Sequence, residues 1–288
     1  MHVYLRGDIL QRLRLISGLI LFVFAGTHFL NHGLGLVGLE VMHRAQELRT
    51  SITRSVPGSI VLLLALLIHM ALSLYKTSRR STWRMPRWEF AQIATGLAIP
   101  FLLLPHIVNT RIAHTLFGVR DSYLYDLTRL WPDSAWQQST LLLLVWVHGC
   151  IGLHHWLRLS DRYKSAKPVV LVIAVAVPVL ALAGFAVSGQ TVSGIMSDAE
   201  ALAALKERSH WPDGVESAAL AQWRNGVRTV FGVLALTAVV MLVLRARSHG
   251  HAGGDQHVTY SGGPTVRFET GQTLLDVSRI AGVPHASV

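Results

Sequence analysis

The sequence contains almost no cysteine and few charged residues. Its one cysteine, Cys150, lies in an apolar segment, so the chain can form neither an internal disulfide nor a metal site built from several thiolates. Charged residues make up 15% of the 288 positions, whereas hydrophobic residues make up 51%. A soluble domain of this length rarely has such a composition, so the sequence predicts an integral membrane protein.

Carboxylates are also missing from the long apolar runs. About 20 helical residues cross the roughly 30 Å hydrocarbon core of a bilayer. Six runs are expected to be transmembrane helices: residues 13–38, 57–75, 90–110, 138–157, 168–189 and 226–245. None has an Asp or Glu in its interior, which disfavours a proton or hard-cation transporter because such sites use carboxylates. A zinc or copper path lined only by histidine remains an alternative.

The basic residues predict the orientation of the chain. They gather before the first run, between the second and third runs, and between the fourth and fifth: Arg6, Arg12 and Arg14, then Lys76, Arg79, Arg80, Arg84 and Arg87, then Arg158, Arg162, Lys164 and Lys167. Lys and Arg favour cytoplasmic loops, so both termini are expected to be cytoplasmic. The net charge of +10 then mostly reflects the orientation of the helices in the membrane. The basic residues flank helices and form no single patch with aromatic residues, so nucleic acid is not expected as a partner.

Histidine is the ionisable residue that the apolar runs do contain. Seven of the fifteen histidines fall within the first four runs, and the last two runs have none: His28, His32, His69, His106, His148, His154 and His155. An ionisable side chain inside a bilayer is costly, so each one is a candidate functional residue. Any one of them could instead be hydrogen-bonded to a neighbouring helix. One histidine near mid-membrane in each of four successive helices is harder to explain in that way.

The helical rise gives the depth of four of these histidines. His28 and His106 are expected about 22 and 26 Å from the cytoplasmic side, and His69 and His148 about 10 and 15 Å from it. A six-coordinate haem takes one imidazole on each side of its iron. The two levels therefore predict two b-type haems stacked across a four-helix bundle. His69 and His148 would hold the inner haem, and His28 and His106 the outer one.

Other residues are expected near these haems. His32 lies one turn after His28 on the same helix face and is an alternative ligand, although the depth of His28 matches that of His106 better. His154 and His155, near the cytoplasmic interface, could hold haem propionates or line a quinone site, and could equally be ordinary interfacial side chains. Pro100 and Pro105 are expected to kink or end the third helix next to His106.

Small residues crowd the helices that contain these histidines. They are Gly18, Gly26, Gly33 and Gly35 in the first run, and Gly149 and Gly152 after His148. They could admit a porphyrin between the helices, and they could equally reflect ordinary packing of membrane helices. The glycines therefore support a porphyrin site without deciding for it.

Two segments resemble a known family. In HGCIGLHH, His148, Gly152 and His155 have the spacing H-x3-G-x2-H, which resembles the haem-binding helix of the succinate dehydrogenase cytochrome b subunit. The resemblance implies that His148 binds haem and that His155 lies beside the haem or a quinone. The segment RLISG loosely resembles the quinone-side start of that family's first helix, with one residue more in its spacing. It implies a quinone role for Arg14 and Ser17.

The character of the sequence changes after residue 246. Residues 247–257 are polar and rich in Gly and His, and are expected to be a linker. Residues 258–288 contain two strand-like pieces around Gly263 and then a helix-like segment, and are too few to bury a core alone. This stretch resembles the start of a plant-type [2Fe-2S] ferredoxin, up to the point where the cysteine loop should begin. It contains no cysteine, so no [2Fe-2S] cluster is expected in this chain.

The order of these parts resembles the N-terminal half of certain bacterial membrane-bound class III adenylate cyclases. The expected fold is an all-α integral membrane anchor (residues 1–246) of six transmembrane helices, followed by a small incomplete α+β cytoplasmic tail. The resemblance implies a bacterial plasma membrane location, a homodimer formed through a C-terminal cyclase, and sensing of the quinone pool. Nothing in the chain resembles the cyclase catalytic domain, so no catalytic residue is expected. The alternatives are an anchor subunit of a quinone oxidoreductase and a histidine-based metal transporter.

Overall fold

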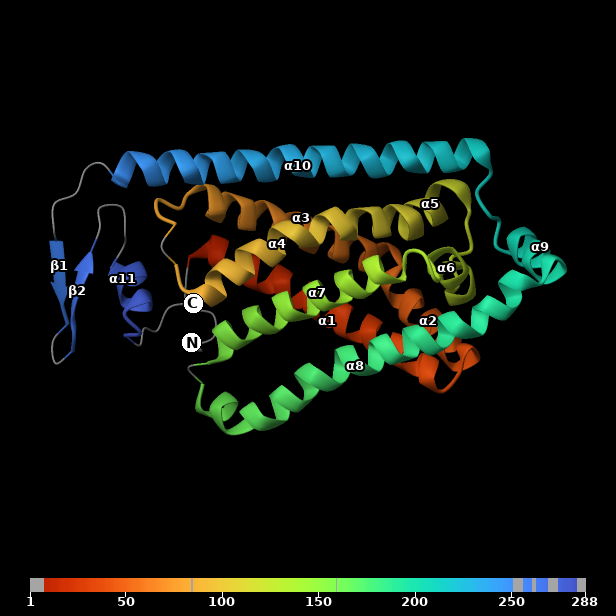
Figure 1. Cartoon of the computed structure of the whole chain (residues 1–288), viewed down its shortest axis with the longest axis horizontal. Helices are drawn as coiled ribbons and strands as arrows, with labels where there is room; N and C mark the ends of the chain where they lie inside the picture. The colour runs from red at the N-terminus through yellow and green to blue at the C-terminus, as the bar shows by residue number, and fades with distance from the viewer. Residues whose placement is uncertain are drawn as a thin grey trace.

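The computed structural model describes residues 8–83, 85–158, 160–250, 256–260, 263–268 and 274–283, most of them helical (Figure 1). Six helical segments are long and apolar enough to cross a membrane: Ile9–Leu36, Val56–Ser78, Arg87–Phe117, Ala135–Leu157, Asp161–Ser197 and Gly214–Ser248. The six expected helices are therefore confirmed, and they indicate a multi-pass membrane protein in contact with lipid.

Most of these segments are single helices. The first consists of α1 (Ile9–Gly33) and a 3-10 turn (Leu34–Leu36), and the second is α3 (Val56–Ser78). The third is continuous from α4 (Arg87–Ile107) through a π-helical stretch (Val108–Ile112) to α5 (Ala113–Phe117). The others are α7 (Ala135–Leu157), α8 (Asp161–Ser197) and α10 (Gly214–Gly250).

Polar caps explain why the helices begin before the apolar runs do. The Asp8 carboxylate accepts a hydrogen bond from the Gln11 backbone N–H (2.8 Å), which fixes the start of α1. At the start of α10, Asp213 and Glu216 each accept a bond from the other's backbone N–H, at 2.8 and 3.2 Å. This capping box starts α10 at Gly214, twelve residues before the expected position 226. A search for apolar runs does not include such polar first turns, so it places the helix starts too late.

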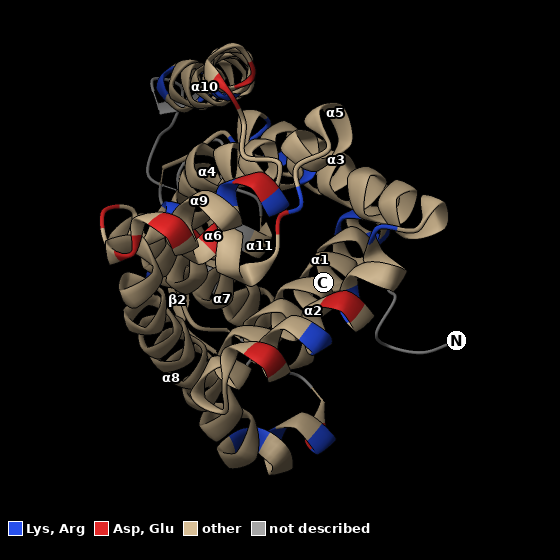
Figure 2. Cartoon of the chain, turned by 90° about the vertical axis from the view of Figure 1, so that its right-hand side faces the viewer, with Lys and Arg blue, Asp and Glu red and all other residues tan. Residues whose placement is uncertain are grey.

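Three shorter helices lie in segments that were expected to be loops. They are α2 (Leu39–Thr53), α6 (Tyr123–Leu130) and α9 (Ala199–Arg208), and they form one end of the molecule, at the right of Figure 1. We call this the far end. Viewed from there, charged residues of both signs lie on these helices, whereas the long helices behind them are mostly uncharged (Figure 2). The opposite end, where residues 79–86 and 158–160 connect the long helices, is called the basic end.

The long helices pack in pairs around the middle of the bundle. α1 packs against α3 and α8, α4 packs against α7, and α10 covers α3 and α4. Phe29 of α1, Trp146 of α7 and Ala181 of α8 form one buried cluster. The α1–α8 crossing is close because it uses glycine, since a Cβ atom at Gly184 would overlap the backbone carbonyl of His32.

The prolines of α4 do not end the helix, contrary to one of the two expectations. Pro105 has no N–H, so it cannot bond to the Phe101 carbonyl one turn earlier. The Nε of Arg228 on α10 donates to this carbonyl instead, at 3.1 Å. The helix then continues past His106 into the π-helical stretch.

The tail contains the hairpin and helix that the sequence suggested. β1 (Gln256–Thr259) pairs antiparallel with β2 (Thr265–Phe268), with Val258 opposite Val266. α11 (Leu274–Ile280) follows, and the Tyr260 hydroxyl lies 2.5 Å from the Ser278 hydroxyl. α10 continues to Gly250, four residues beyond the expected end of the membrane anchor at residue 246.

The α1–α8 crossing gives a stability prediction. Gly184→Ala should lower stability by about 1–3 kcal/mol, because the added methyl group must push two backbones apart. The change is measured as the thermal unfolding midpoint in detergent. Gly194→Ala on the same helix is the control, since no atom lies within 4 Å of a Cβ there. An equal loss in both variants would contradict the close crossing.

Candidate cofactor site

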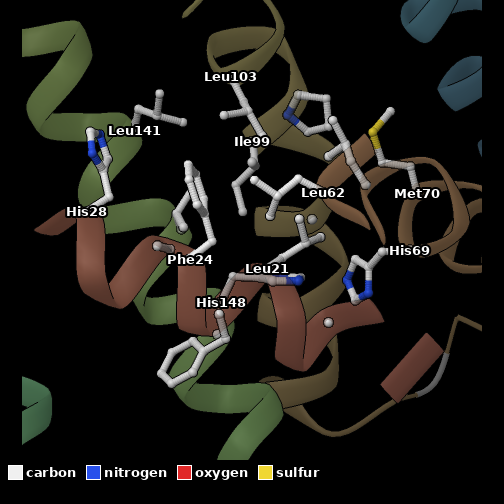
Figure 3. Close-up of a pocket in the computed structure, with 18 of the residues that line it drawn as sticks. Leu21, Phe24, His28, Leu62, His69, Met70, Ile99, Leu103, Leu141 and His148 are labelled. Carbon is white, nitrogen blue, oxygen red and sulfur yellow. The ribbon is translucent and has the colours of Figure 1, made fainter. Parts of the chain in front are cut away.

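A cavity of about 910 Å³ lies inside the bundle, mainly between α1, α3, α4 and α7. This volume is at the upper end of the range for ligand pockets, roughly 300–1,000 Å³. All four expected ligand histidines line it, and apolar side chains make up most of its wall. Figure 3 shows apolar residues such as Phe24, Leu62 and Ile99 in the space between His28 and His69.

The first histidine pair lies nearer the basic end. The rings of His69 on α3 and His148 on α7 have their centres 6.2 Å apart and are almost perpendicular, at 87°. The His69 Nδ1 lies 3.2 Å from the Arg14 carbonyl oxygen, so Nδ1 carries the proton and donates it. This leaves the lone pair on Nε2, the nitrogen available to a metal.

The surroundings of His148 fix the same tautomer. Its Nδ1 lies 3.0 Å from the Thr95 hydroxyl, and that hydroxyl donates its own proton to the Ala91 carbonyl at 2.7 Å. Nδ1 of His148 must therefore donate, and Nε2 keeps its lone pair. The Gln92 amide nitrogen lies 3.4 Å from this Nε2 and is suited to donate to it. Both rings of the pair thus have an Nε2 atom that can accept or ligate.

A glycine lies against each ring of this pair. A Cβ atom added at Gly18 would lie 2.9 Å from Cε1 of His69, and one added at Gly96 would lie 3.0 Å from Cε1 of His148. The separation at Gly18 is too short for a real side chain and the one at Gly96 is unusually tight, so both glycines leave space that the rings occupy. The sequence analysis singled out Gly18 of α1 as a small residue near the histidines. It did not single out Gly96, which lies on α4.

The second pair lies nearer the far end. The rings of His28 on α1 and His106 on α4 also have their centres 6.2 Å apart, at an angle of 49°. The alternative ligand His32 lies edge-on to His28 at 4.7 Å, and the rings of Tyr123 and Phe185 contact it at 5.2 and 6.0 Å. The structure thus brings His28 to His106 and encloses His32 among aromatic rings.

Two nitrogens of this cluster have no hydrogen-bond partner. Nδ1 of His28 and Nδ1 of His32 are buried, and no described protein atom bonds to either. Buried polar atoms in proteins are nearly always satisfied, so an unpaired one calls for a partner from outside the chain. The far-end cluster therefore has capacity for a ligand that the protein itself does not fill.

The spacing within each pair suits ligation of one metal ion from two sides. Metal–imidazole bonds are about 2 Å long, so two rings on opposite sides of one ion have their centres about 6 Å apart. Both pairs match this separation. The angle between the rings can differ because each ring is free to turn about its metal–nitrogen bond. The ring separations are therefore compatible with one metal ion held between the two histidines of each pair.

Cationic side chains line the cavity at the basic end, among them Arg14, Lys76, Arg80 and Arg158. Arg80 is held by Glu89 at 2.6 Å in a buried ion pair. The buried Nε of Arg158 has no hydrogen-bond partner among the described residues. An anionic group inside the cavity would supply the missing acceptor.

The remaining predicted residues at this end divide into two groups. His155 lines the cavity and stacks on Trp88, with ring centres 3.3 Å apart, and Arg14 also lines the cavity. His154 instead bonds through Nδ1 to the Tyr163 hydroxyl of α8, at 2.8 Å. The Ser17 hydroxyl is buried and donates to the Arg14 carbonyl at 3.0 Å. His155 and Arg14 are thus placed to meet a ligand, whereas His154 and Ser17 have partners within the protein.

Sequence reasoning missed the polar network at the far end. Arg54, which directly follows α2, forms a bidentate ion pair with the buried Asp121, and the Gln46 amide donates to the Asp121 backbone carbonyl at 3.0 Å. Arg49 and Asp126 line the cavity nearby. Burial lowers the pKa of Arg49, and it raises the pKa of Asp126 well above its usual value, with Asp121 adding to that rise. The spacing of Gln46, Arg49 and Thr53 is that of one face of a helix. This spacing could have predicted a polar helix in the segment before the second apolar run.

Asp126 gives a prediction for the pH dependence of stability. Its raised pKa means that the folded state holds a proton that the unfolded state releases above about pH 4. Stability should therefore fall as pH rises from 5 to 7, and Asp126→Asn should reduce this fall. Thermal unfolding across this range measures the effect, with the exposed Asp133→Asn as control. Equal pH slopes in Asp126→Asn and the unmodified protein would contradict the assignment.

Comparisons with family models, curated proteins and solved structures find no match for this chain. Among the described residues, no three His, Cys, Asp or Glu side chains form a group that could hold a metal ion. The geometry itself establishes two histidine pairs, each from two helices, that face one cavity inside a bundle of six apolar helices. The assignment of function depends on this arrangement.

Proposed function

We propose that the chain is a dihaem cytochrome b domain of the membrane. One haem would be held between His69 and His148, and the other between His28 and His106. The observation that carries the proposal is the equal 6.2 Å spacing of two histidine pairs that face the same cavity. Haem, when bound, supplies a reversible one-electron carrier at its iron.

Other side chains of the cavity support this proposal. Arg14 and Arg158 at the basic end, and Arg49 and Arg111 at the far end, line the cavity and can bind carboxylates such as haem propionates. Guanidinium groups at both ends of the cavity would provide partners for the carboxylates of two haems. Between the ends, the apolar wall excludes water from the space around the rings.

The two pairs are separated along the axis of α1. His28 lies ten residues beyond Gly18, the contact of His69, which corresponds to a rise of about 15 Å along α1. Two one-electron carriers at these positions would connect the two faces of the membrane. His155 and Trp88 at the basic end are then placed where a quinone head group could approach the nearer carrier.

The biological role that we propose is redox sensing. The resemblance of the whole chain suggests a regulatory module of a bacterial plasma membrane adenylate cyclase, with both termini cytoplasmic and a homodimer formed through the cyclase. We propose that α10 transmits the change in helix arrangement from the haem site to the tail. It contacts α4 through Arg228 and continues to Gly250 before the tail. Signalling requires that the two oxidation states favour different helix arrangements.

Two other functions make different demands. An anchor subunit of a quinone oxidoreductase would use the same histidines but would show rapid quinol-dependent turnover with an added acceptor. A histidine-based zinc or copper transporter would show metal flux in liposomes without haem. The paired rings, unlike a chain of single ligands along a path, favour haem over transport.

The first prediction from this proposal concerns haem content. The full chain, purified in detergent from cells supplied with haem, should show low-spin b-type spectra and about two haems per chain, since each pair can hold one. Oxidised and dithionite-reduced spectra with a pyridine haemochrome assay measure this. A colourless protein would overturn the dihaem proposal.

The second prediction tests the pairing. His69→Ala should remove one haem and leave the haem at His28 and His106, and His28→Ala should do the reverse. Gly18→Ala should weaken retention of the haem at His69, because the new methyl group would displace that ring. Gly26→Ala on the same helix is the control, since its Cβ would make only an ordinary contact with Trp146, at 3.9 Å. Loss of both haems from each single variant, with the fold intact, would argue for another pairing.

A further inference from the structure

A second, smaller cavity lies outside the cofactor site, between α4, α7 and α10 at the far end. Its volume is about 240 Å³, and polar side chains form most of its lining. His106 lines both this cavity and the larger one. The smaller cavity therefore lies directly behind a residue of the far-end histidine pair, and the proposed function assigns it no role.

Two arginines of α10 dominate the charge of this cavity. Arg224 donates through Nη1 to the Asn109 side-chain oxygen at 2.9 Å, and Arg228 donates through Nε to the Phe101 carbonyl at 3.1 Å. Each guanidinium has five N–H donors, so both retain donors for a further partner. No carboxylate among the described residues pairs with either arginine. No Asp or Glu is among the residues that line the cavity, so no described carboxylate in the lining compensates the positive charge of the two guanidinium groups.

Neutral donors complete the lining. Gln137 lies in the first turn of α7, and its side chain makes no hydrogen bond within the described part of the chain. Gln138 lines both cavities. The positive end of the α7 dipole adds to the potential of the two arginines. The cavity therefore offers several hydrogen-bond donors and a positive field, and lacks an acid.

We propose that this cavity binds a phosphate group, either of a phospholipid head group or of free phosphate. Guanidinium groups bind phosphate through two parallel hydrogen bonds, and two arginines one helical turn apart can share one tetrahedral anion. A cavity of about 240 Å³ accommodates a small anionic group. This inference depends on the membrane bundle and not on the presence of haem.

The position of the cavity is appropriate for a lipid. Arg228 faces α4 but is still exposed, and Trp223 beside Arg224 is also exposed. Exposed tryptophans of membrane helices concentrate at the level of the lipid head groups. A phosphate bound here would contact α10, α4 and α7 together and would hold α10 against the segment that carries His106.

Binding of defined lipids to the full-length protein in detergent tests the proposal. Phosphatidylglycerol should raise the thermal unfolding midpoint and remain bound in native mass spectrometry, whereas diacylglycerol with the same acyl chains should do neither. Inorganic phosphate is tested in parallel. Stabilisation by the lipid alone would identify a head group as the source, and stabilisation by inorganic phosphate as well would show that the free anion binds.

Substitutions of the lining residues test whether the phosphate group binds in the smaller cavity. Arg224→Gln with Arg228→Gln should weaken binding by about tenfold or more, because charge-assisted hydrogen bonds are lost. Gln137→Met removes an amide without an internal partner, so it should weaken binding even if the double arginine variant folds poorly. Arg208→Gln on α9 is the control, since among the described residues its side chain bonds to the Ala204 carbonyl of its own helix. Equal binding to the unmodified protein and to a folded Gln137→Met or double arginine variant, or no binding of either phosphate source, would overturn the proposal.

Discussion

Hydrocarbon offers no hydrogen-bond partner to a polar side chain, and this constraint governs the inside of the bundle. Where a histidine nitrogen has a partner, an adjacent helix supplies it, as the Arg14 carbonyl does for His69 and Thr95 does for His148. Where it has none, as at His28, the ring faces a cavity that has room for a ligand. That room lies mainly between α1, α3, α4 and α7, and the other helices pack around these four.

Much of this arrangement could be predicted because it depends on length and periodicity. Apolar runs gave the six long helices, and helical rise placed His69 level with His148 and His28 level with His106, which the structure brings together in the same two pairs. Their role as ligands remains a prediction. Depth along each helix can be calculated from the sequence alone, and this is why pairing by level was informative.

The features that were missed depend on contacts between distant segments. Gly96 matters only because His148 lies against it, and the sequence does not say which helix faces α4. The partnership of Arg228 with the Phe101 carbonyl likewise joins two helices that are far apart in the chain. The short helices α2 and α6 escaped a search for long apolar runs, although their polar residues close the far end of the cavity. Such contacts follow from the packing and not from local periodicity.

The carbonyl that Pro105 leaves without its helical partner also has a consequence for how the bundle is assembled. Ribosomes release α4 into the membrane well before α10 has been synthesised, so during that interval the Phe101 oxygen lacks the guanidinium that later bonds to it. Water or the insertion machinery must supply a donor to this oxygen in that interval. A helix made later, α10, therefore supplies a hydrogen-bond donor to the third membrane segment, and α4 cannot reach its final environment until translation has passed Arg228.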